Sequence, residues 1–206
     1  MNITKNGIPL DKKLYTIDLK TKTFSTNESD LVLDFSDCYG CTFKTGHNWT
    51  FKTEHNCTFR TGSYCTFRTG WNCTFKTGSY CTFKTGDNCT FKTGCHCIFD
   101  TGFGCTFITG NSCTFDTGDS CTFKTENVCT FDTGDSCTFD TGSNCVIVRR
   151  DIFEIIEIPK NIKIKLNESK GYEIINEPKI EKIKIGELFY NKREIEEKLK
   201  DIKPVS

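Results

Sequence analysis

Fifteen cysteines are the side chains of this chain best suited to chemistry, as nucleophiles, metal ligands or disulfide partners. Thirteen of them recur at one position of an eight-residue repeat, whereas Cys38 and Cys95 fall outside this register. Zinc needs four ligands that converge on one point, and a spacing of eight residues makes a row instead. We therefore predict free, buried thiols. A disulfide ladder is the alternative, although cysteines in parallel rows point the same way and an odd number leaves one unpaired.

Two further groups of residues could bind a metal ion. Cys95, His96 and Cys97 are consecutive, but no second pair of ligands accompanies them. Four aspartates come from two copies of the sequence Asp-Thr-Gly-Asp-Ser: Asp116, Asp119, Asp132 and Asp135. Stacked carboxylates could hold a hard cation such as calcium, and exposed turn aspartates are the simpler interpretation. We predict neither a metal nor a cofactor.

The sequence contains no arrangement typical of an enzyme. It has no nucleophile beside a base, no glycine-rich phosphate loop and no paired acid and base. His47 and His55 have no evident partner. We therefore predict a non-enzymatic protein. Ice binding is disfavoured as well, because the outward threonines are paired with charged residues on the same face, as Thr74 is with Lys76.

One unit, Cys-Thr-Phe-x-Thr-Gly-x-x, positions these residues and occurs thirteen times in succession from Cys41 to Asn144. Alternate side chains of a strand point to opposite faces, so the Cys, the Phe and the second Thr share one face. The constant, apolar face is predicted to point inward, and the first Thr and the variable fourth residue to face water. The Gly is predicted to give the backbone freedom for a corner.

A single unit cannot bury its own Phe, but stacked units can, and such a stack is a β-solenoid. Similar corners recur sixteen residues apart, as Ser63-Tyr64 and Ser79-Tyr80 do. This favours two units per coil over a triangular coil of twenty-four residues, which would scatter the rows. The predicted fold class is all-β: a β-solenoid of stacked octapeptide repeats, with sixteen residues and two strands per coil, capping segments and a short C-terminal helix.

Both flanks are predicted to cap the solenoid, because its open ends would expose strand edges and core. We expect an N-terminal strand and cap over 1–40, the repeat solenoid over 41–148, and a β-rich C-terminal cap with a terminal helix over 149–206. Alternating residues predict an N-terminal strand at Tyr15, Ile17 and Leu19.

Isoleucine-rich segments predict strands within 152–158, 162–166 and 180–185. Asn191 followed by Glu194 fits the start of a helix. Its apolar stripe would consist of Ile195, Leu199 and Ile202.

The fourth position of the unit carries most of the outward charge, although the net charge of the chain is zero. With two units per coil, one face carries Lys44, Arg60, Lys76, Lys92, Ile108, Lys124 and Asp140. The other face carries Lys52, Arg68, Lys84, Asp100, Asp116 and Asp132. The first is a mainly basic ladder and the second is split in sign. Like charges stacked about 4.8 Å apart repel one another, and a negatively charged partner would relieve this. A solvated, salt-screened ladder is the alternative.

The predicted partner-binding residues are Lys44, Arg60, Lys76 and Lys92, with Tyr64 and Tyr80 near them. Tyr64, Tyr80 and His96 should line one corner, and Trp71 and Phe103 the other. Exposed aromatic side chains can anchor a protein partner or stack on bases, and packing of the corner is the alternative.

The repeat and its flanks, Asn6-Gly7-Ile8-Pro9-Leu10 and Val148-Arg149-Arg150-Asp151, resemble octapeptide-repeat proteins encoded by phages, prophages and their bacterial hosts. The resemblance is strongest from Leu31 to about Phe153 and implies an origin in a mobile genetic element. A more distant likeness is to pentapeptide-repeat solenoids, which also place a small residue two before a central Leu or Phe. Some of those mimic duplex DNA, which needs an acidic surface that only the later coils offer here.

These observations predict a non-catalytic, phage- or mobile-element-encoded solenoid that binds a macromolecular partner, with a host defence protein as the inhibited partner. One alternative is a structural virion or assembly component that forms homo-oligomers through the solenoid ends or the C-terminal cap. Another is nucleic-acid binding by the basic ladders. Neither a signal peptide nor an apolar run long enough to span a membrane is visible, so we expect no membrane partner and a bacterial cytoplasmic or virion location.

Overall fold

The structure is a computed structural model that describes residues 2–18, 20, 22–37, 39–149, 152, 154–158, 162–167, 171–175, 182–185 and 188–191. The chain divides into two compact units, Met1–Ile174 and Ile175–Ser206. In the second unit, the described residues form an antiparallel hairpin of β23 (Lys182–Ile185) and β24 (Leu188–Asn191). The predicted C-terminal helix lies outside the described residues. The predicted domain boundaries stay a prediction.

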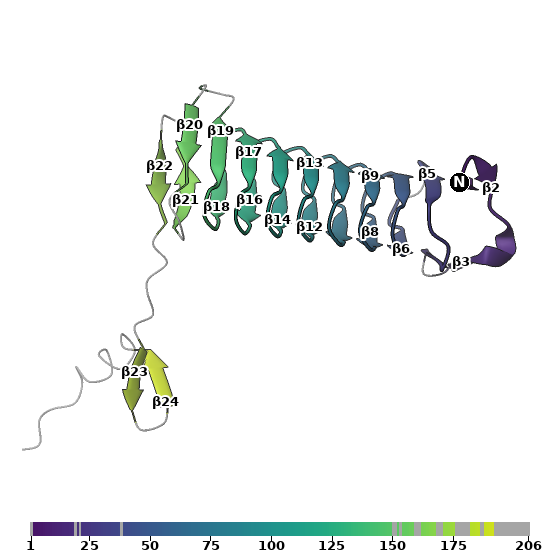
Figure 1. The fold of residues 1–206 in the computed structure, drawn as a ribbon, viewed down its shortest axis with the longest axis horizontal. Helices are drawn as coiled ribbons and strands as arrows, with labels where there is room; N and C mark the ends of the chain where they lie inside the picture. Colours follow the sequence, from purple (N-terminus) through teal and green to yellow (C-terminus); the bar gives the residue numbers. More distant parts are fainter. Residues whose placement is uncertain are drawn as a thin grey trace, which may run out of the picture. The chain divides into compact units, whose positions relative to one another are not determined.

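The first unit is a β-solenoid in which successive octapeptides alternate between two sheets, and the repeat strands within each sheet are parallel (Figure 1). Sheet A contains β5 (Leu31–Phe35), β7 (Thr50–Thr53), β9 (Thr66–Arg68), β11 (Thr82–Lys84), β13 (Ile98–Asp100), β15 (Thr114–Asp116), β17 (Thr130–Thr133) and β19 (Val146–Arg149). Sheet B contains β4 (Thr23–Thr26), β6 (Thr42–Lys44), β8 (Thr58–Arg60), β10 (Thr74–Lys76), β12 (Thr90–Lys92), β14 (Thr106–Ile108), β16 (Thr122–Lys124) and β18 (Thr138–Asp140).

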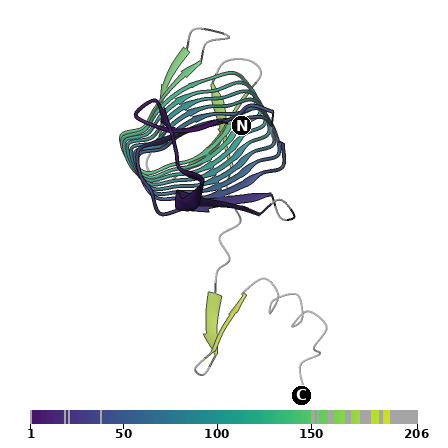
Figure 2. The ribbon, with the colours of Figure 1, turned by 90° about the vertical axis from the view of Figure 1, so that its right-hand side faces the viewer.

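Within the repeats, each strand pairs in register with the strand sixteen residues further on, so Phe75 lies beside Phe91 and Lys76 beside Lys92. The sixteen-residue coil with two strands is therefore confirmed, and the triangular coil is wrong. Figure 2, which looks along the stack, shows successive coils nearly superimposed.

The core consists of two columns of phenylalanines, one from each sheet. Phe75 stacks on Phe91 of the same sheet, with ring centroids 4.9 Å apart and planes 2° from parallel. It meets Phe83 of the opposite sheet edge-on, at 5.2 Å and 75°. Both arrangements suit the aromatic quadrupole, and the rings are buried. The predicted inward face of the unit is confirmed.

Antiparallel strands close both ends of the solenoid. At the N-terminal end, β1 (Asn2–Lys5) pairs with β5 of sheet A and with β2 (Ile8–Pro9). The short 3₁₀ turn η1 (Lys12–Leu14) follows, and β3 (Tyr15–Asp18) then pairs with β4 of sheet B. At the other end, β20 (Glu154–Glu157) covers β19. There, β21 (Lys163–Leu166) covers β18 and pairs in turn with β22 (Tyr172–Ile174). The strands predicted at Tyr15 and in the three isoleucine-rich segments are confirmed.

The corner chemistry differs from the prediction, because the left-handed residue is the eighth of the unit and not the Gly at the sixth position. Asn72, Tyr80 and Asn88, for example, have φ values of 55°, 57° and 55°. The Gly favours close stacking instead, although Glu54 and Glu126 occupy this position in two units. A Cβ on Gly118 would lie 3.0 Å from the backbone nitrogen and 3.2 Å from the Cα of Phe103 in the preceding coil.

Candidate interaction surface

The predicted basic ladder exists on sheet B. Lys44, Arg60, Lys76 and Lys92 end β6, β8, β10 and β12, and each lies beside the next in register. All four side chains are exposed. Among the described residues, no carboxylate forms an ion pair with any of them. The ladder is therefore a run of uncompensated positive charge.

Sheet A carries a different ladder, in which acidic residues flank the basic ones. The Nζ atom of Lys84 lies 2.8 Å from Oδ2 of Asp100, and that of Lys52 lies 3.9 Å from Oδ2 of Asp34. Both pairs are solvent-exposed, and exposed pairs contribute little to stability. On this sheet, Asp34 and Asp100 therefore neutralise the first and the last cation of the row Lys52, Arg68 and Lys84.

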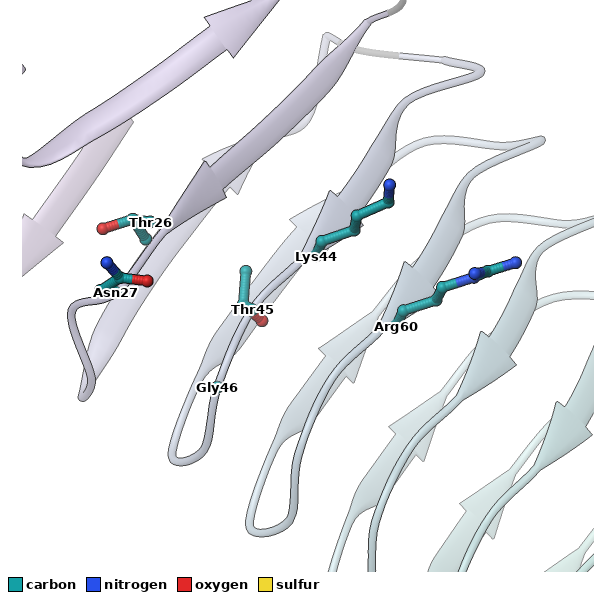
Figure 3. Close-up of a pocket in the computed structure, with 6 residues that line it drawn as sticks. All are labelled: Thr26, Asn27, Lys44, Thr45, Gly46 and Arg60. Atoms are coloured by element: carbon teal, nitrogen blue, oxygen red, sulfur yellow. The ribbon is translucent and has the colours of Figure 1, made fainter.

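Two open hollows follow the basic ladder. The first, shown in Figure 3, has a volume of about 540 Å³ and is lined by Thr26, Asn27, Lys44, Thr45, Gly46 and Arg60. The second has a volume of about 430 Å³ and is lined by His47, Arg60, Thr61, Gly62, Ser63, Lys76, Thr77 and Gly78. Each lies between two cations of adjacent coils, and Arg60 borders both. Figure 3 shows Lys44 and Arg60 extending side by side, as neighbours that could contact one anionic group.

The corner that leads from sheet B to sheet A carries the predicted aromatic row. Tyr64 stacks on Tyr80 with ring centroids 5.1 Å apart and planes 5° from parallel, and Tyr80 stacks on His96 at 4.8 Å and 11°. The two tyrosines remain 59% and 50% exposed. They line neither of the two hollows. They therefore form an aromatic edge next to the basic face.

The backbone at this aromatic row is unfavourable for the residues it carries. Tyr64, Tyr80 and His96 have φ values of 61°, 57° and 56°, in the left-handed region that Gly and Asn tolerate best. At the opposite corner the same position holds only Gly, Asn or Ser, from Gly40 to Ser136. Val128 of the same row shares this conformation, with a φ of 61°, so the strain belongs to the whole corner row.

The opposite corner, from sheet A to sheet B, carries Trp71 and Phe103, as predicted. Sequence reasoning missed the partner of His55, whose ring stacks on Trp71 at 4.7 Å and 13°. It also missed that of His47, whose Nδ1 accepts a hydrogen bond of 2.9 Å from the backbone nitrogen of Ser63. The signal was the sixteen-residue spacing, which places each seventh residue over the next one.

The corner aspartates follow the same rule. The Oδ1 atom of Asp119 accepts a hydrogen bond of 3.1 Å from the backbone nitrogen of Asp135, one coil further on, and Asp87 does the same for Phe103. Within the described part of the chain, no three His, Cys, Asp or Glu side chains converge as metal ligands. These aspartates thus have a structural role in the corners.

The repeat thiols are buried and free from Cys57 to Cys145. Each Sγ lies near corner carbonyls, as Cys73 does at 3.6 Å from the oxygens of Trp71 and of Glu54. The neighbouring Cys129 thiol and burial raise the pKa of Cys145 above its ordinary value, which keeps it protonated and unreactive. The prediction of free thiols is wrong for Cys41, which is disulfide-bonded. It lies in the first repeat, where the corner preceding it does not belong to a regular unit.

No protein-family model matches the chain, and comparisons with curated proteins and with solved structures find no match. The structure supports a β-solenoid of Cys/Thr/Phe octapeptides, and the narrower resemblance to phage-encoded repeat proteins stays a prediction. In the part of the chain that the structure describes, no helix is long and apolar enough to cross a membrane.

Proposed function

We propose that this protein is a non-catalytic binding protein and that the basic ladder of sheet B recognises an acidic surface on a protein partner. The observation that carries the proposal is the run of four exposed cations, Lys44, Arg60, Lys76 and Lys92, without ion-paired carboxylates among the described residues. The in-register pairing of β6, β8, β10 and β12 holds them at one strand spacing.

Electrostatics favours such a partner for two reasons. Cations stacked about 4.8 Å apart repel one another, and carboxylates between them would remove that repulsion. The backbone that carries them is held by the phenylalanine columns, so binding orders side chains without ordering the chain. Charge complementarity of this kind mainly increases the association rate and the specificity.

The aromatic edge supplies the apolar part of the proposed surface. Tyrosine is among the residues that dominate binding energy at protein interfaces. Tyr64 and Tyr80 are half-exposed and already stacked, so little side-chain entropy is lost when a partner covers them. Their left-handed backbone supports a role in binding, because Asn would suit that position better for folding.

Charge reversal tests this surface. The triple variant Arg60→Glu, Lys76→Glu, Lys92→Glu should lose at least about 10-fold in affinity, or about 1.4 kcal/mol, for a partner captured from the source cell and then purified. The measurement is calorimetry with that partner. The control is the triple variant Lys52→Glu, Arg68→Glu, Lys84→Glu on sheet A. It has the same net charge as the sheet B variant and should bind the partner as tightly as the unaltered protein does. Unchanged affinity of the sheet B variant would exclude this face.

The aromatic edge is tested separately with Tyr64→Asn, Tyr80→Asn. Asn occupies the equivalent position at Asn48 and Asn144, with φ values of 61° and 58°. This variant should keep or raise its melting temperature and bind the same partner more weakly. If its affinity is unchanged, the tyrosines serve only to pack the corner.

Nucleic acid is the second candidate partner, because the same ladder and aromatic edge could contact phosphates and bases. It predicts that a short DNA duplex binds in fluorescence anisotropy and that its affinity falls steeply with salt. A host defence protein as the partner, a phage origin, a structural role in a virion and a bacterial cytoplasmic location stay predictions. The end-to-end association that a structural role predicts would be seen as oligomers that grow with concentration.

A further inference from the structure

The outward ladder of sheet A has a pattern of charge that is complementary to itself. Read from β7 to β17, its residues are Lys52, Arg68, Lys84, Asp100, Asp116 and Asp132. Three cations are followed by three carboxylates at constant strand spacing. The change of sign falls between β11 and β13, midway along the row. Reversing the order of the coils and the sign of every charge therefore leaves this row unchanged.

We infer that sheet A binds sheet A of a second copy of this chain, about a two-fold axis that runs parallel to the strands between β11 and β13. Rotation about this axis turns the sheet face to face with its copy and reverses the order of the coils. Because the axis is parallel to the strands, the fourth-position row remains opposite the fourth-position row. Lys84 then faces Asp100 of the second copy, and Arg68 faces Asp116. Lys52, which also pairs with Asp34 of its own chain, faces the half-buried Asp132. A two-fold axis makes every pair twice, and the interface is closed.

Only one register satisfies this pattern. A shift by one coil in one direction places Lys84 opposite Lys84 of the second copy, and a shift in the other direction places Asp100 opposite Asp100. In the matched register the next residues along the row, Asp34 and Val148, face each other and introduce no like charges. The charges therefore specify orientation and register together, in the way that like-charge contacts exclude wrong pairings.

The second outward row of sheet A supports the same axis. The second residue of the unit is Thr in every repeat except one, where it is Ile98. Ile98 lies on β13, directly beside the proposed axis, and its side chain is 53% exposed. In the dimer it faces Thr82 of the second copy, and the two Ile98 side chains lie one strand spacing apart at the centre. The single apolar replacement in this row thus lies at the centre of the symmetric interface, where water is excluded most completely.

Sheet B does not allow an equivalent pairing, because its ladder is basic from Lys44 to Lys92 and again at Lys124. Two copies of that face would place cation on cation. The inference is independent of the function proposed above, since it uses the opposite face of the solenoid. The contact covers six strands of about 4.8 Å spacing, which is smaller than a standard interface. We therefore expect a dimer that dissociates on dilution and at high salt.

A charge-swap experiment tests the inference by sedimentation velocity at low salt. All proteins carry Cys95→Ser, because Cys95 is the one free thiol in the described chain that is not fully buried, and Ser occupies its row at Ser63 and Ser79. Arg68→Glu and Asp116→Lys should each weaken the dimer at least about 10-fold, because each creates two like-charge contacts. The double variant should restore it, and so should an equimolar mixture of the two single variants.

The rescue cannot arise within one molecule, because Arg68 and Asp116 lie three coils apart, about 14 Å. Lys76→Glu on sheet B is the matched control and should leave the dimer intact. A protein that is monomeric up to about 1 mM at low salt overturns the inference. It is overturned equally by a dimer that the double variant does not restore or that Lys76→Glu weakens as much as Arg68→Glu does.

Discussion

At the scale of single residues, the last three positions of the repeat divide the work of the corner. The sixth position allows close approach of successive coils. The backbone nitrogen of Gly118, for example, donates a hydrogen bond of 3.2 Å to the carbonyl oxygen of Gly102 in the preceding coil. The seventh offers a side-chain acceptor to the next coil, as Ser63 does for Ser79. The eighth turns the chain with a positive φ. Glu126 replaces Gly at the sixth position, and its carbonyl still accepts a hydrogen bond of 3.3 Å from the backbone nitrogen of Gly142 in the next coil.

The sixth position provides a matched pair of glycines for a stability test. Gly118→Ala should destabilise the protein by about 1–3 kcal/mol, because the new Cβ would meet backbone atoms of Phe103 at 3.0 and 3.2 Å that no side-chain rotation can move. Gly46→Ala is the control, because a Cβ there has no atom within 4 Å, and it should change the free energy of unfolding by less than about 1 kcal/mol. Denaturant titration measures both, and equal effects would show that stacking does not require Gly.

At the scale of elements, the C-terminal cap depends on a buried ion pair. Arg149, at the end of β19, is fully buried, and its Nη1 lies 3.8 Å from Oε2 of Glu154 on β20. The carboxylate of Glu154 also accepts hydrogen bonds of 3.0 and 3.2 Å from the backbone nitrogen of Gly171. One side chain therefore links β19, β20 and the turn before β22 at the point where the sheets change from parallel to antiparallel.

Neutralising this carboxylate should weaken the cap. Glu154→Gln leaves the buried charge of Arg149 less compensated and should lower the free energy of unfolding by about 1–3 kcal/mol. Glu157→Gln, at the exposed end of the same strand, is the control and should change stability by less than about 0.5 kcal/mol. Hydrogen exchange should locate the loss in β20 to β22. A loss spread evenly over all coils would argue against a local role for the pair.

At the scale of the whole molecule, each coil contacts only its neighbours, so stability should be nearly a sum over coils. Deleting residues 105–120 removes one complete coil and leaves every remaining strand in its own sheet. We expect this variant to fold, with a circular dichroism spectrum of the same shape as that of the full-length protein and with a lower melting temperature. Deleting residues 105–116 ends within a unit. This variant should not form a cooperatively folded structure, because the strands and corners after the deletion lose their register with the preceding coils. Equal behaviour of the two variants would contradict the additive picture.

The periodic part of this protein follows from the order of its amino acids alone. Alternation along the strand set the inward Phe and Cys, and recurrence every sixteen residues set the coil, the two sheets and the membership of each charged row. These are local or repetitive properties, so they can be read without coordinates. The predicted ladder of Lys44, Arg60, Lys76 and Lys92 followed from them directly.

The contacts between coils outside the strands depend on the three-dimensional packing of the chain. The close approach at the sixth position, the acceptor role of His47 and the pairing of Lys84 with Asp100 depend on residues about one coil apart meeting in space. The left-handed conformation of the eighth residue was seen only in the backbone of the structure. The antiparallel caps depend on segments outside the repeat, and the disulfide at Cys41 does not follow from the repeat pattern. A repeat specifies how its units stack because every unit experiences the same neighbours. At corners and ends the neighbours differ, and there the three-dimensional contacts determine the outcome.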